Sequence, residues 1–344
     1  MKYDVTIGIP IYNVEKYIRL AMDSALTQTF KNIEFLVLDD CGTDSSIDIV
    51  REYQQTHPRG KDIRIVRQPH NMGIGQARNR IVQETQGKYL YFMDADDLIT
   101  PNTIEILYTN ACRYNADLVY GSHERIENFE GEKKTFKCQY PQLLFLKDDE
   151  FANWVYRQYN GIQAMTWNIL IDIDIFRKNS LSYPSANFWE DFSFTMDLPT
   201  YVTRVVLLPD ITYYYNCRYG SLSNFSKRNS IDKIEIQSIL DAMTLVKQNT
   251  SRILIKPYFS QRMFKIMLTH FYIVCAILRN AKITNPPFTN REIRDVMTSP
   301  LSLVETLHLK KWRLKNLFLF LLGVLPPFIS VFIMGKIGKF KGFI

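Results

Sequence analysis

The first 122 residues predict an α/β fold with a doubly wound, mostly parallel sheet covered by helices on both faces. Short apolar runs alternate there with stretches in which apolar residues recur at helical spacing. This alternation is typical of βαβ units, whose strands lie parallel in one sheet. From residue 226 to about residue 300 the pattern is helical, so we expect a helical C-terminal region after the sheet.

Five short apolar runs are the expected strands, because each stops at polar or turn-forming residues. They are residues 5–11, 33–38, 63–66, 89–93 and 118–120. Between them, apolar residues three and four positions apart predict helices with one inward face. These inward residues are Tyr17, Ile18 and Ala21, then Ile47, Val50 and Tyr53, then Ala77, Ile81 and Val82, and then Ile104, Leu107, Tyr108 and Ala111.

Polar side chains gather where the expected strands end. They are Tyr12 and Asn13 after the first strand, Asp39 and Asp40 after the second, and Asp94, Asp96 and Asp97 after the fourth. Ligands of such sheets bind beyond the carboxyl ends of the strands, so these residues predict a binding site. Any single aspartate could instead cap a helix or a turn. Five carboxylates at one edge, however, require a cation or hydrogen-bond donors nearby.

Composition limits the partners and the compartment. The 344 residues are 46% apolar and 22% charged, which excludes a disordered or fibrous protein. The net charge of +7 raises the question of nucleic acid or anionic membrane. Residues 310–344 hold seven lysines and arginines and no acids, which favours an anionic membrane and no nucleic acid. Five cysteines without CxxC spacing argue against zinc and disulfides, and with the polar start of the chain they predict a cytoplasmic location.

Ordered sequence blocks give the chain a resemblance to family 2 glycosyltransferases with the GT-A fold. The blocks are Val5–Asn13 (VTIGIPIYN), Gln28–Glu34 (QTFKNIE), Leu38–Ser45 (LDDCGTDS), Asn71–Asn79 (NMGIGQARN), Met93–Leu98 (MDADDL) and Trp189–Phe192 (WEDF). They follow that family's order over residues 4–225, about two-thirds of the chain. One departure is Cys41-Gly42, where the family usually has Gly-Ser after the paired aspartates.

The resemblance implies a nucleotide-sugar donor bound at the first two strand ends. Pro10, Tyr12 and Asp39 are expected to line the nucleoside pocket, with Asn13 and Asp40 beside them. An aromatic ring can stack on a base, and a carboxylate can accept a hydrogen bond from an imide N–H of a uracil-like base. The alternative for Tyr12 is simple packing at the strand end.

The resemblance also implies a divalent ion, Mn²⁺ or Mg²⁺, at Asp94-Ala95-Asp96, which matches the family's DxD motif. Asp96 is the expected direct ligand, and Asp94 is expected on the metal, its bound water or the ribose. Asp97 is expected to cap the turn. Arg78 and Arg218 are expected to bind donor phosphates, because a guanidinium binds phosphate bidentately. An exposed helix arginine is the alternative for Arg78.

On the acceptor side, the resemblance assigns catalysis to Glu190 and Asp191. Inverting transfer needs one base to take a proton from the acceptor hydroxyl, and we expect Asp191 to be that base. Glu190 is expected to orient Asp191 or to bind the acceptor, and Trp167, Asn168 and Trp189 to border the acceptor pocket. The alternative for the two acids is stabilisation of a helix N-terminus through its dipole.

The expected function is therefore metal-dependent, inverting transfer of one hexosyl or N-acetylhexosaminyl group. The donor is a nucleotide-sugar, a UDP-sugar by preference, and the acceptor is a glycan or a lipid-linked molecule of surface polysaccharide biosynthesis. The Gln-x-x-Arg-Trp signature of processive members is absent, which predicts a single transfer. A sugar-nucleotide nucleotidyltransferase and a non-catalytic, membrane-associated glycan- or nucleotide-binding subunit are the alternatives.

We expect a catalytic domain over residues 1–225, with a donor half at 1–122 and an acceptor half at 123–225. A helical region at 226–300 and a basic, apolar, membrane-associating tail at 301–344 would follow. Within the tail, residues 317–334 carry no charge and are interrupted by Pro326-Pro327. Lysines on both sides favour a helical hairpin at the cytoplasmic face of the membrane, and two helices docked on the catalytic domain are the alternative.

Overall fold

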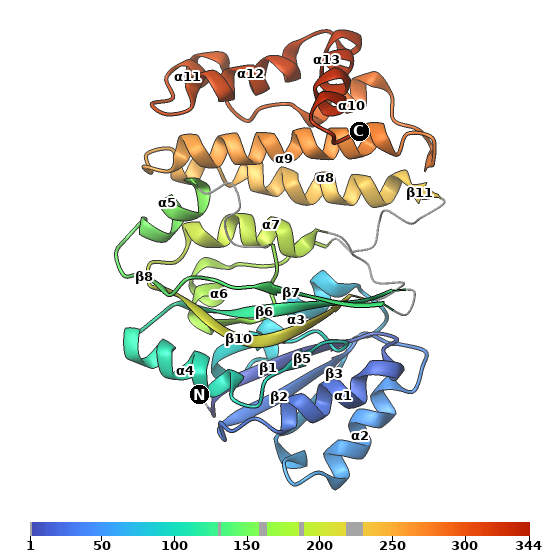
Figure 1. Cartoon of the computed structure of the whole chain (residues 1–344), viewed down its shortest axis with the longest axis vertical. Coiled ribbons are helices and arrows are strands. Elements are labelled where there is room, and N and C mark those ends of the chain that lie inside the picture. Colours follow the sequence, from blue (N-terminus) through green and yellow to red (C-terminus); the bar gives the residue numbers. More distant parts are fainter. Residues whose placement is uncertain (1, 130–131, 158–163, 186–188, 218–229) are drawn as a thin grey trace. The chain divides into compact units, whose positions relative to one another are not determined.

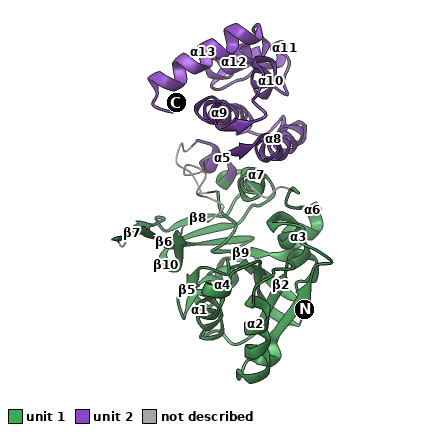
Figure 2. Ribbon diagram, turned by 90° about the vertical axis from the view of Figure 1, so that its right-hand side faces the viewer, with its two compact units in different colours: residues 1–151, 164–224 green, residues 152–163, 225–344 purple. Residues whose placement is uncertain are grey.

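The computed structural model describes residues 2–129, 132–157, 164–185, 189–217 and 230–344. The chain divides into two compact units, coloured separately in Figure 2. The first unit comprises residues 1–151 and 164–224, and the second comprises residues 152–163 and 225–344.

The described part of the first unit contains a ten-stranded mixed sheet. Eight strands follow the order β3-β2-β1-β4-β9-β6-β10-β5, and β7 and β8 pair with β6 and β10 beside this path. Its first four strands are parallel. They are β3 (Ile63–Arg67), β2 (Ile33–Asp39), β1 (Tyr3–Ile11) and β4 (Gly87–Phe92). Next, β9 (Ile169–Asp172) runs antiparallel to both its neighbours, and β10 (Val205–Cys217) runs parallel to β6 (Leu118–Phe129). Three further strands pair antiparallel with β6 or β10: β5 (Leu98–Ile99), β7 (Glu132–Cys138) and β8 (Leu143–Phe145).

Helices cover both faces of this sheet, as Figure 1 shows. On one face, α1 (Glu15–Leu26), α2 (Ser46–Thr56) and α4 (Thr103–Tyr114) share a buried core with alternate residues of β1, β2 and β4. On the other face, α3 (Ile74–Glu84) lies so close to β1 that a Cβ at Gly8 would stand 2.5 Å from Ile81. The remaining helices that begin in this unit are α5 (Glu150–Arg157), α6 (Ile173–Asn179) and α7 (Glu190–Asp197). The predicted α/β fold is confirmed.

Strand register brings the polar strand ends together. Ile11 at the end of β1 pairs with Asp39 of β2, and Asp39 pairs in turn with Arg67 at the end of β3. The carboxyl ends of three neighbouring parallel strands therefore lie at one edge of the sheet, where ligands of such sheets bind.

The second unit is helical in its described part. Its longest helices are α8 (Lys233–Gln248) and α9 (Phe259–Arg279). Shorter helices follow: α10 (Asn290–Val296), α11 (Leu303–Leu307), α12 (Arg313–Val324) and α13 (Pro327–Phe340). A two-stranded sheet pairs β11 (Ile231–Asp232) with β12 (Thr284–Asn285). Both α12 and α13 pack on α9 and α10 of the same unit.

One helix among the described residues, α9, has the length and apolar composition to cross a membrane. Because 67% of its most apolar stretch is buried inside the protein, α9 also matches the core helix of a soluble unit. Proline accounts for the break between α12 and α13: Pro326 precedes the first residue of α13, and Pro327 begins it.

Candidate active site

The loop after β1 is tied to the loop after β2. Tyr12 leaves 49% of its surface exposed at this edge, so its ring is available to a ligand. Asn13 has a φ of 52° and accepts a 2.7 Å hydrogen bond from the backbone N–H of Thr43. A Cβ at Gly42 would stand 3.0 Å from both the backbone nitrogen and Oδ1 of Asn13. Glycine after Cys41 therefore allows this close approach.

Asp39 and Asp40 have different surroundings. Asp39 accepts a 2.9 Å bond from the backbone N–H of Cys41, and one of its oxygens lies 3.3 Å from Nε of the exposed Arg67. Both oxygens of Asp40 are used within the protein, because they accept bonds from the backbone N–H groups of Met72 and Gly73 at 2.9 and 3.0 Å. Burial raises the pKa of Asp40, and these two donors oppose the rise.

The carboxylate of Asp40 anchors the loop that leads into α3, and its expected donor contact stays a prediction. Pro10 is buried within β1, next to the residues that face the edge.

The turn after β4 carries the two candidate metal ligands, Asp94 and Asp96, both partly exposed. Burial raises the pKa of Asp94 to about 6, with Asp96 and Glu190 adding to the rise and Arg78 opposing it. The described residues contain no group of three or more His, Cys, Asp or Glu side chains that could hold a metal ion. Two carboxylates completed by substrate phosphate oxygens are nevertheless a common Mg²⁺ arrangement, so Asp94 and Asp96 fit such an ion.

Asp97 is 1% exposed and links this turn to β10. It accepts hydrogen bonds of 2.7 Å from the hydroxyl of Tyr213 and from the backbone N–H of Asn216, both on β10. The Tyr213 hydroxyl also accepts a bond from the backbone N–H of Asp94, and the Asn216 amide donates to the carbonyl of Asp96. The expected turn cap is thus replaced by a link between the candidate metal turn and β10.

Arg78 joins this turn to the start of α7. Arg78 is 4% exposed, and its guanidinium donates a hydrogen bond to Glu190 and lies 3.4 Å from Asp94. Its Nε has no hydrogen-bond partner among the described residues, and its guanidinium stands 5.8 Å from the ring centre of Tyr183. Arg78, which we expected to bind donor phosphate, therefore lies between Asp94 on the donor side and Glu190 on the acceptor side.

Asp191 follows Glu190 in the first turn of α7 and accepts a 2.7 Å bond from the backbone N–H of Phe192. Burial raises the pKa of Asp191 to about 7, and the charge of Glu190 adds to the rise. Arg78 and the Phe192 N–H oppose it. A carboxylate with this pKa is a stronger base than an ordinary aspartate and is still largely ionised just above neutral pH.

The next residue of α3, Asn79, holds the segment before α7. Its amide donates to the carbonyl of Tyr183 at 2.9 Å and accepts from the backbone N–H of Tyr183 at 2.7 Å. Gln76, one turn earlier on the helix, donates to the hydroxyl of Ser185. One face of α3 therefore fixes both the residues before α7 and the first carboxylate of that helix.

The three predicted acceptor residues differ in exposure. Trp189 is partly exposed, with its ring 5.1 Å from that of Phe192. Trp167 is 8% exposed and stacks on Tyr213 at 4.4 Å, in an aromatic floor that continues to Tyr215.

Asn168, the third of these residues, is fully buried. Its amide accepts from the hydroxyls of Tyr91 and Thr212 and donates to the carbonyl of Ser122. This side chain therefore stabilises the sheet, and its expected contact with the acceptor stays a prediction.

With this geometry established, comparison with known proteins identifies the family. The model of "Glycosyl transferase family 2" matches residues 6–179. The chain belongs to that family.

Two relatives show how much of the chain the sequence similarity covers. A glycosyltransferase of Streptococcus pneumoniae serotype 4, GlyA, is 30% identical over 64% of this chain, and the match spans only 31% of GlyA. A cholesterol galactosyltransferase of Borreliella burgdorferi is 25% identical over 79% of this chain and 77% of its own length.

Two solved structures share the fold. S. aureus TarS residues 1–349, in complex with UDP-GlcNAc, match with a TM-score of 0.61 and 16% identity, over 98% of this chain and 92% of theirs. The mannosyltransferase PcManGT from Pyrobaculum calidifontis, in complex with GDP-Man and Mn²⁺, has a TM-score of 0.51 and 13% identity, over 98% and 88%. At these identities the likeness shows the GT-A fold alone.

Sequence reasoning missed three contributors to the site of this family 2 member. Arg67 could have been suspected, because it ends the third strand beside Asp39. Tyr213 and Asn216 gave no local signal, since their partners lie more than a hundred residues away. Arg218, predicted to bind phosphate, lies outside the described residues.

Proposed function

We propose that this protein is a metal-dependent, inverting glycosyltransferase that transfers one sugar from a nucleotide-sugar to a hydroxyl group of its acceptor. The observation that carries the proposal is the position of Arg78, which contacts Asp94 of the DxD turn and Glu190 beside the candidate base. This arrangement supports a donor and an acceptor that meet at one centre. We assign the catalysis to residues 1–225, with its donor half at 1–122 and its acceptor half at 123–225.

On the donor side, the exposed ring of Tyr12 is placed to stack on a base, and Asp39 can accept a hydrogen bond from the imide of a uracil. Asp94 and Asp96 would hold Mn²⁺ or Mg²⁺, which when bound neutralises charge on the leaving diphosphate. The complexes of TarS with UDP-GlcNAc and of PcManGT with GDP-Man and Mn²⁺ support this class of donor and ion. A UDP-sugar is our specific proposal.

On the acceptor side, Asp191 removes the proton of the attacking hydroxyl group. As that oxygen bonds to the anomeric carbon, the bond from this carbon to the phosphate oxygen breaks, and its electron pair leaves with the nucleoside diphosphate. Retention by double displacement would require a second carboxylate as nucleophile. Glu190 is buried and bonded to Arg78, which supports a positioning role and a single displacement with inversion.

The proposed acceptor is a glycan or lipid-linked molecule of surface polysaccharide biosynthesis, at the cytoplasmic face of the membrane. The basic, apolar segment 301–344 and the relative named cholesterol galactosyltransferase support an acceptor in or near lipid. We treat residues 226–300 as a helical region that connects this segment to the catalytic part.

The test is an assay of UDP-, GDP- and dTDP-sugars with Mn²⁺ and an extract of lipid-linked glycans as acceptor. We expect nucleoside diphosphate and a glycosylated product of inverted anomeric configuration, read by NMR. A nucleotidyltransferase would instead release pyrophosphate from a nucleoside triphosphate and a sugar phosphate. Binding of donors without any turnover would favour a non-catalytic subunit and would contradict the proposal.

A further inference from the structure

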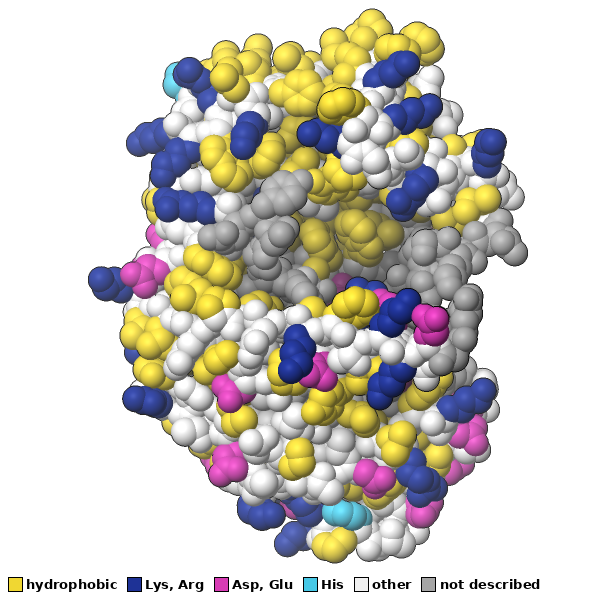
Figure 3. Space-filling view, viewed as in Figure 1, with side chains coloured by type: hydrophobic (Ala, Val, Ile, Leu, Met, Phe, Trp, Pro, Cys, Tyr) yellow, Lys and Arg dark blue, Asp and Glu magenta, His cyan; other side chains and the backbone are white. Residues whose placement is uncertain are grey.

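The last helices of the second unit expose many large apolar side chains. Of the twenty such exposed side chains among the described residues, eleven lie between residues 303 and 340. On α12 and α13 they are Leu314, Phe318, Leu321, Val324, Phe328, Ile329, Phe332 and Phe340. Their spacing places them along the outward side of each helix. Figure 3 shows hydrophobic side chains gathered over these helices, with lysines and arginines among them. We name this set the outer apolar face.

The inward side of the same helices carries the buried Leu319, Leu322 and Met334 together with small and polar residues. A Cβ at Gly323 would stand 2.4 Å from the carbonyl oxygen of Met297, and one at Gly338 would stand 3.0 Å from the sulfur of Cys275 on α9. Asn316 donates to the carbonyl of Ser260, and Ser330 donates to that of Leu322. The helices are thus held to the unit by apolar packing, close approach and polar bonds, and eight further large apolar side chains face outward. A water-facing helix normally carries charged and polar residues on its outer side instead.

Positive charge accompanies the outer apolar face. Seven lysines and arginines flank it, and residues 310–344 contain no acid. None of the seven forms an ion pair within the described part of the chain. Three instead lie near aromatic rings: Lys315 over Trp312 at 4.6 Å, Lys336 over Phe332 at 5.5 Å and Lys341 over Phe340 at 5.7 Å. Their charges therefore remain available to an anionic partner.

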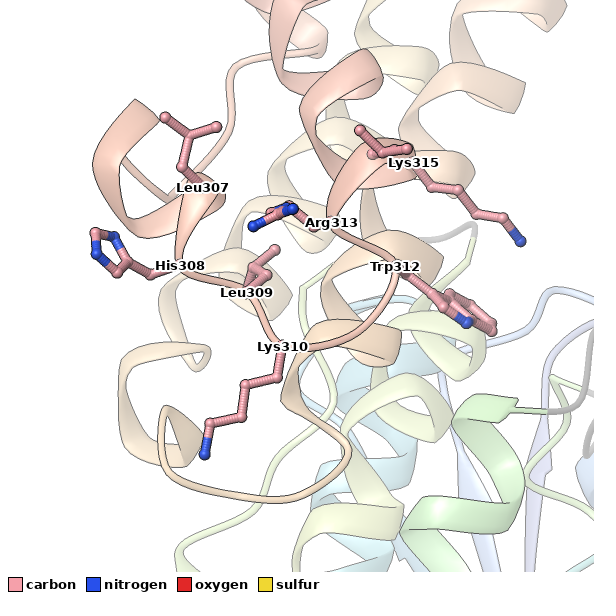
Figure 4. Close-up of a pocket in the computed structure, with 8 residues that line it drawn as sticks. Leu307, His308, Leu309, Lys310, Trp312, Arg313 and Lys315 are labelled. Carbon is pink, nitrogen blue, oxygen red and sulfur yellow. The ribbon is translucent and has the colours of Figure 1, made fainter.

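A hollow at the start of α12 combines both features. It has a volume of about 720 Å³ and is lined by Leu307, Lys310, Trp312, Arg313 and Lys315 among others. Figure 4 shows Trp312 and Lys315 extending together to one side, while Arg313 lies above Leu309. Lys315 beside the indole ring of Trp312, with Lys310 and Arg313 on the same hollow, matches a phosphate group at the border between water and lipid.

We propose that the outer apolar face docks the protein on a bilayer of anionic phospholipid. Its phenylalanines and leucines enter the interfacial layer, and the flanking cations, including those of the hollow, bind lipid phosphates. This inference rests on the proposed function for its lipid-linked acceptor. It adds to that function the residues that contact the membrane. Charge complementarity favours an anionic bilayer over a second copy of this chain, because a second copy would bring seven further cations to the same face.

The experiment is sedimentation of the full chain with phosphatidylcholine vesicles and with vesicles that also contain phosphatidylglycerol. We expect binding to the anionic vesicles alone, weakening as salt rises. The triple variant Leu314→Ser, Phe328→Ser, Phe332→Ser should bind at least about 10-fold more weakly. The double variant Lys336→Glu, Lys339→Glu should lose binding while keeping the apolar face.

A matched control is Ile234→Ser with Ile255→Ser, which removes two exposed apolar side chains of the same unit, at 74% and 95% exposure, away from this face. It should bind vesicles like the unmodified protein. Unchanged vesicle binding by the triple variant, or no binding by the unmodified chain, overturns the proposal. So does a dimer that the triple variant converts to a monomer. Nucleotide release with a water-soluble acceptor, measured on every variant, separates failure of docking from failure of the proposed reaction.

Discussion

Arg78 on α3 donates a hydrogen bond to Glu190 at the start of α7, although the two residues are 112 positions apart and both are buried. The same guanidinium approaches Asp94 at 3.4 Å. Its positive charge offsets the mutual repulsion of the carboxylates, which would otherwise be costly in a site screened from water. The donor and acceptor sides of the site are coupled electrostatically through this one side chain.

Replacing Arg78 by methionine is expected to destabilise the protein by about 3 kcal/mol, because it leaves buried carboxylates without their cation. Transfer activity should fall by about 100-fold or more, since Glu190 and Asp94 lose their common partner. Urea unfolding and initial rates measure the two effects. The control is Arg80→Met on the same helix, whose partly exposed pair with Glu84 should contribute less than about 1 kcal/mol. Equal stability of the two variants would refute the coupling role.

The pH dependence of kcat/KM should report Asp191. Burial and Glu190 raise the pKa of Asp191 to about 7, and only its ionised form can accept a proton. The rate should therefore rise with pH through about 7 and level off above it. In Glu190→Gln one charge that raises this pKa is removed, so the inflection should move to lower pH. A profile that is flat from pH 5.5 to pH 8, or an inflection unmoved in the variant, would contradict the assignment.

Stability should also depend on Asp191, with the opposite sign to activity. Because its pKa is higher in the folded protein than the usual 3.8, folding favours the protonated form. Its contribution is complete below about pH 4 and is lost as pH rises through about 7. Asp191→Asn should therefore raise the melting temperature at pH 8, by about 6 °C, and raise it less at pH 5. A lower melting temperature at pH 8 would mean that the carboxylate is stabilising as an ion.

Metal and nucleotide should stabilise the protein together. If Asp94 and Asp96 hold an ion that also binds diphosphate, UDP with Mn²⁺ at about 100 times the dissociation constant should add about 2.7 kcal/mol. Asp96→Asn should abolish this gain, whereas Asp48→Asn, at an exposed surface acid, should retain it. Differential scanning fluorimetry with and without EDTA measures both. A full gain in Asp96→Asn would exclude that residue as a ligand.

Local sequence patterns were sufficient to predict the sheet and the strand ends. Asp39, Asp94 and Asp96 directly follow or end buried apolar runs, and parallel register then places them at one edge. The region after residue 122 was harder, because β6 continues to Phe129 and β9 enters the sheet antiparallel between β4 and β6. Pairing between strands so distant in sequence leaves no periodic signal in either strand.

The partners of individual side chains were beyond sequence reasoning for the same reason. The sequence gives no sign that the amide of Asn168 is hydrogen-bonded to Tyr91, Thr212 and Ser122. Nor does a pair of aspartates show which member has both carboxylate oxygens bonded to backbone N–H groups, as Asp40 has. Residue type predicted the chemistry of the site, whereas burial decided which residues can take part.

In the proposed mechanism, Asp191 is the base that deprotonates the acceptor. The most direct measurement compares Asp191→Asn with the unmodified protein in single-turnover transfer from the preferred nucleotide-sugar, with donor affinity measured by calorimetry. Asparagine keeps the shape of the side chain but cannot accept the proton. We predict donor affinity within about 2-fold and transfer reduced by about 100-fold or more. Transfer at the unmodified rate, with donor affinity preserved, would contradict the claim.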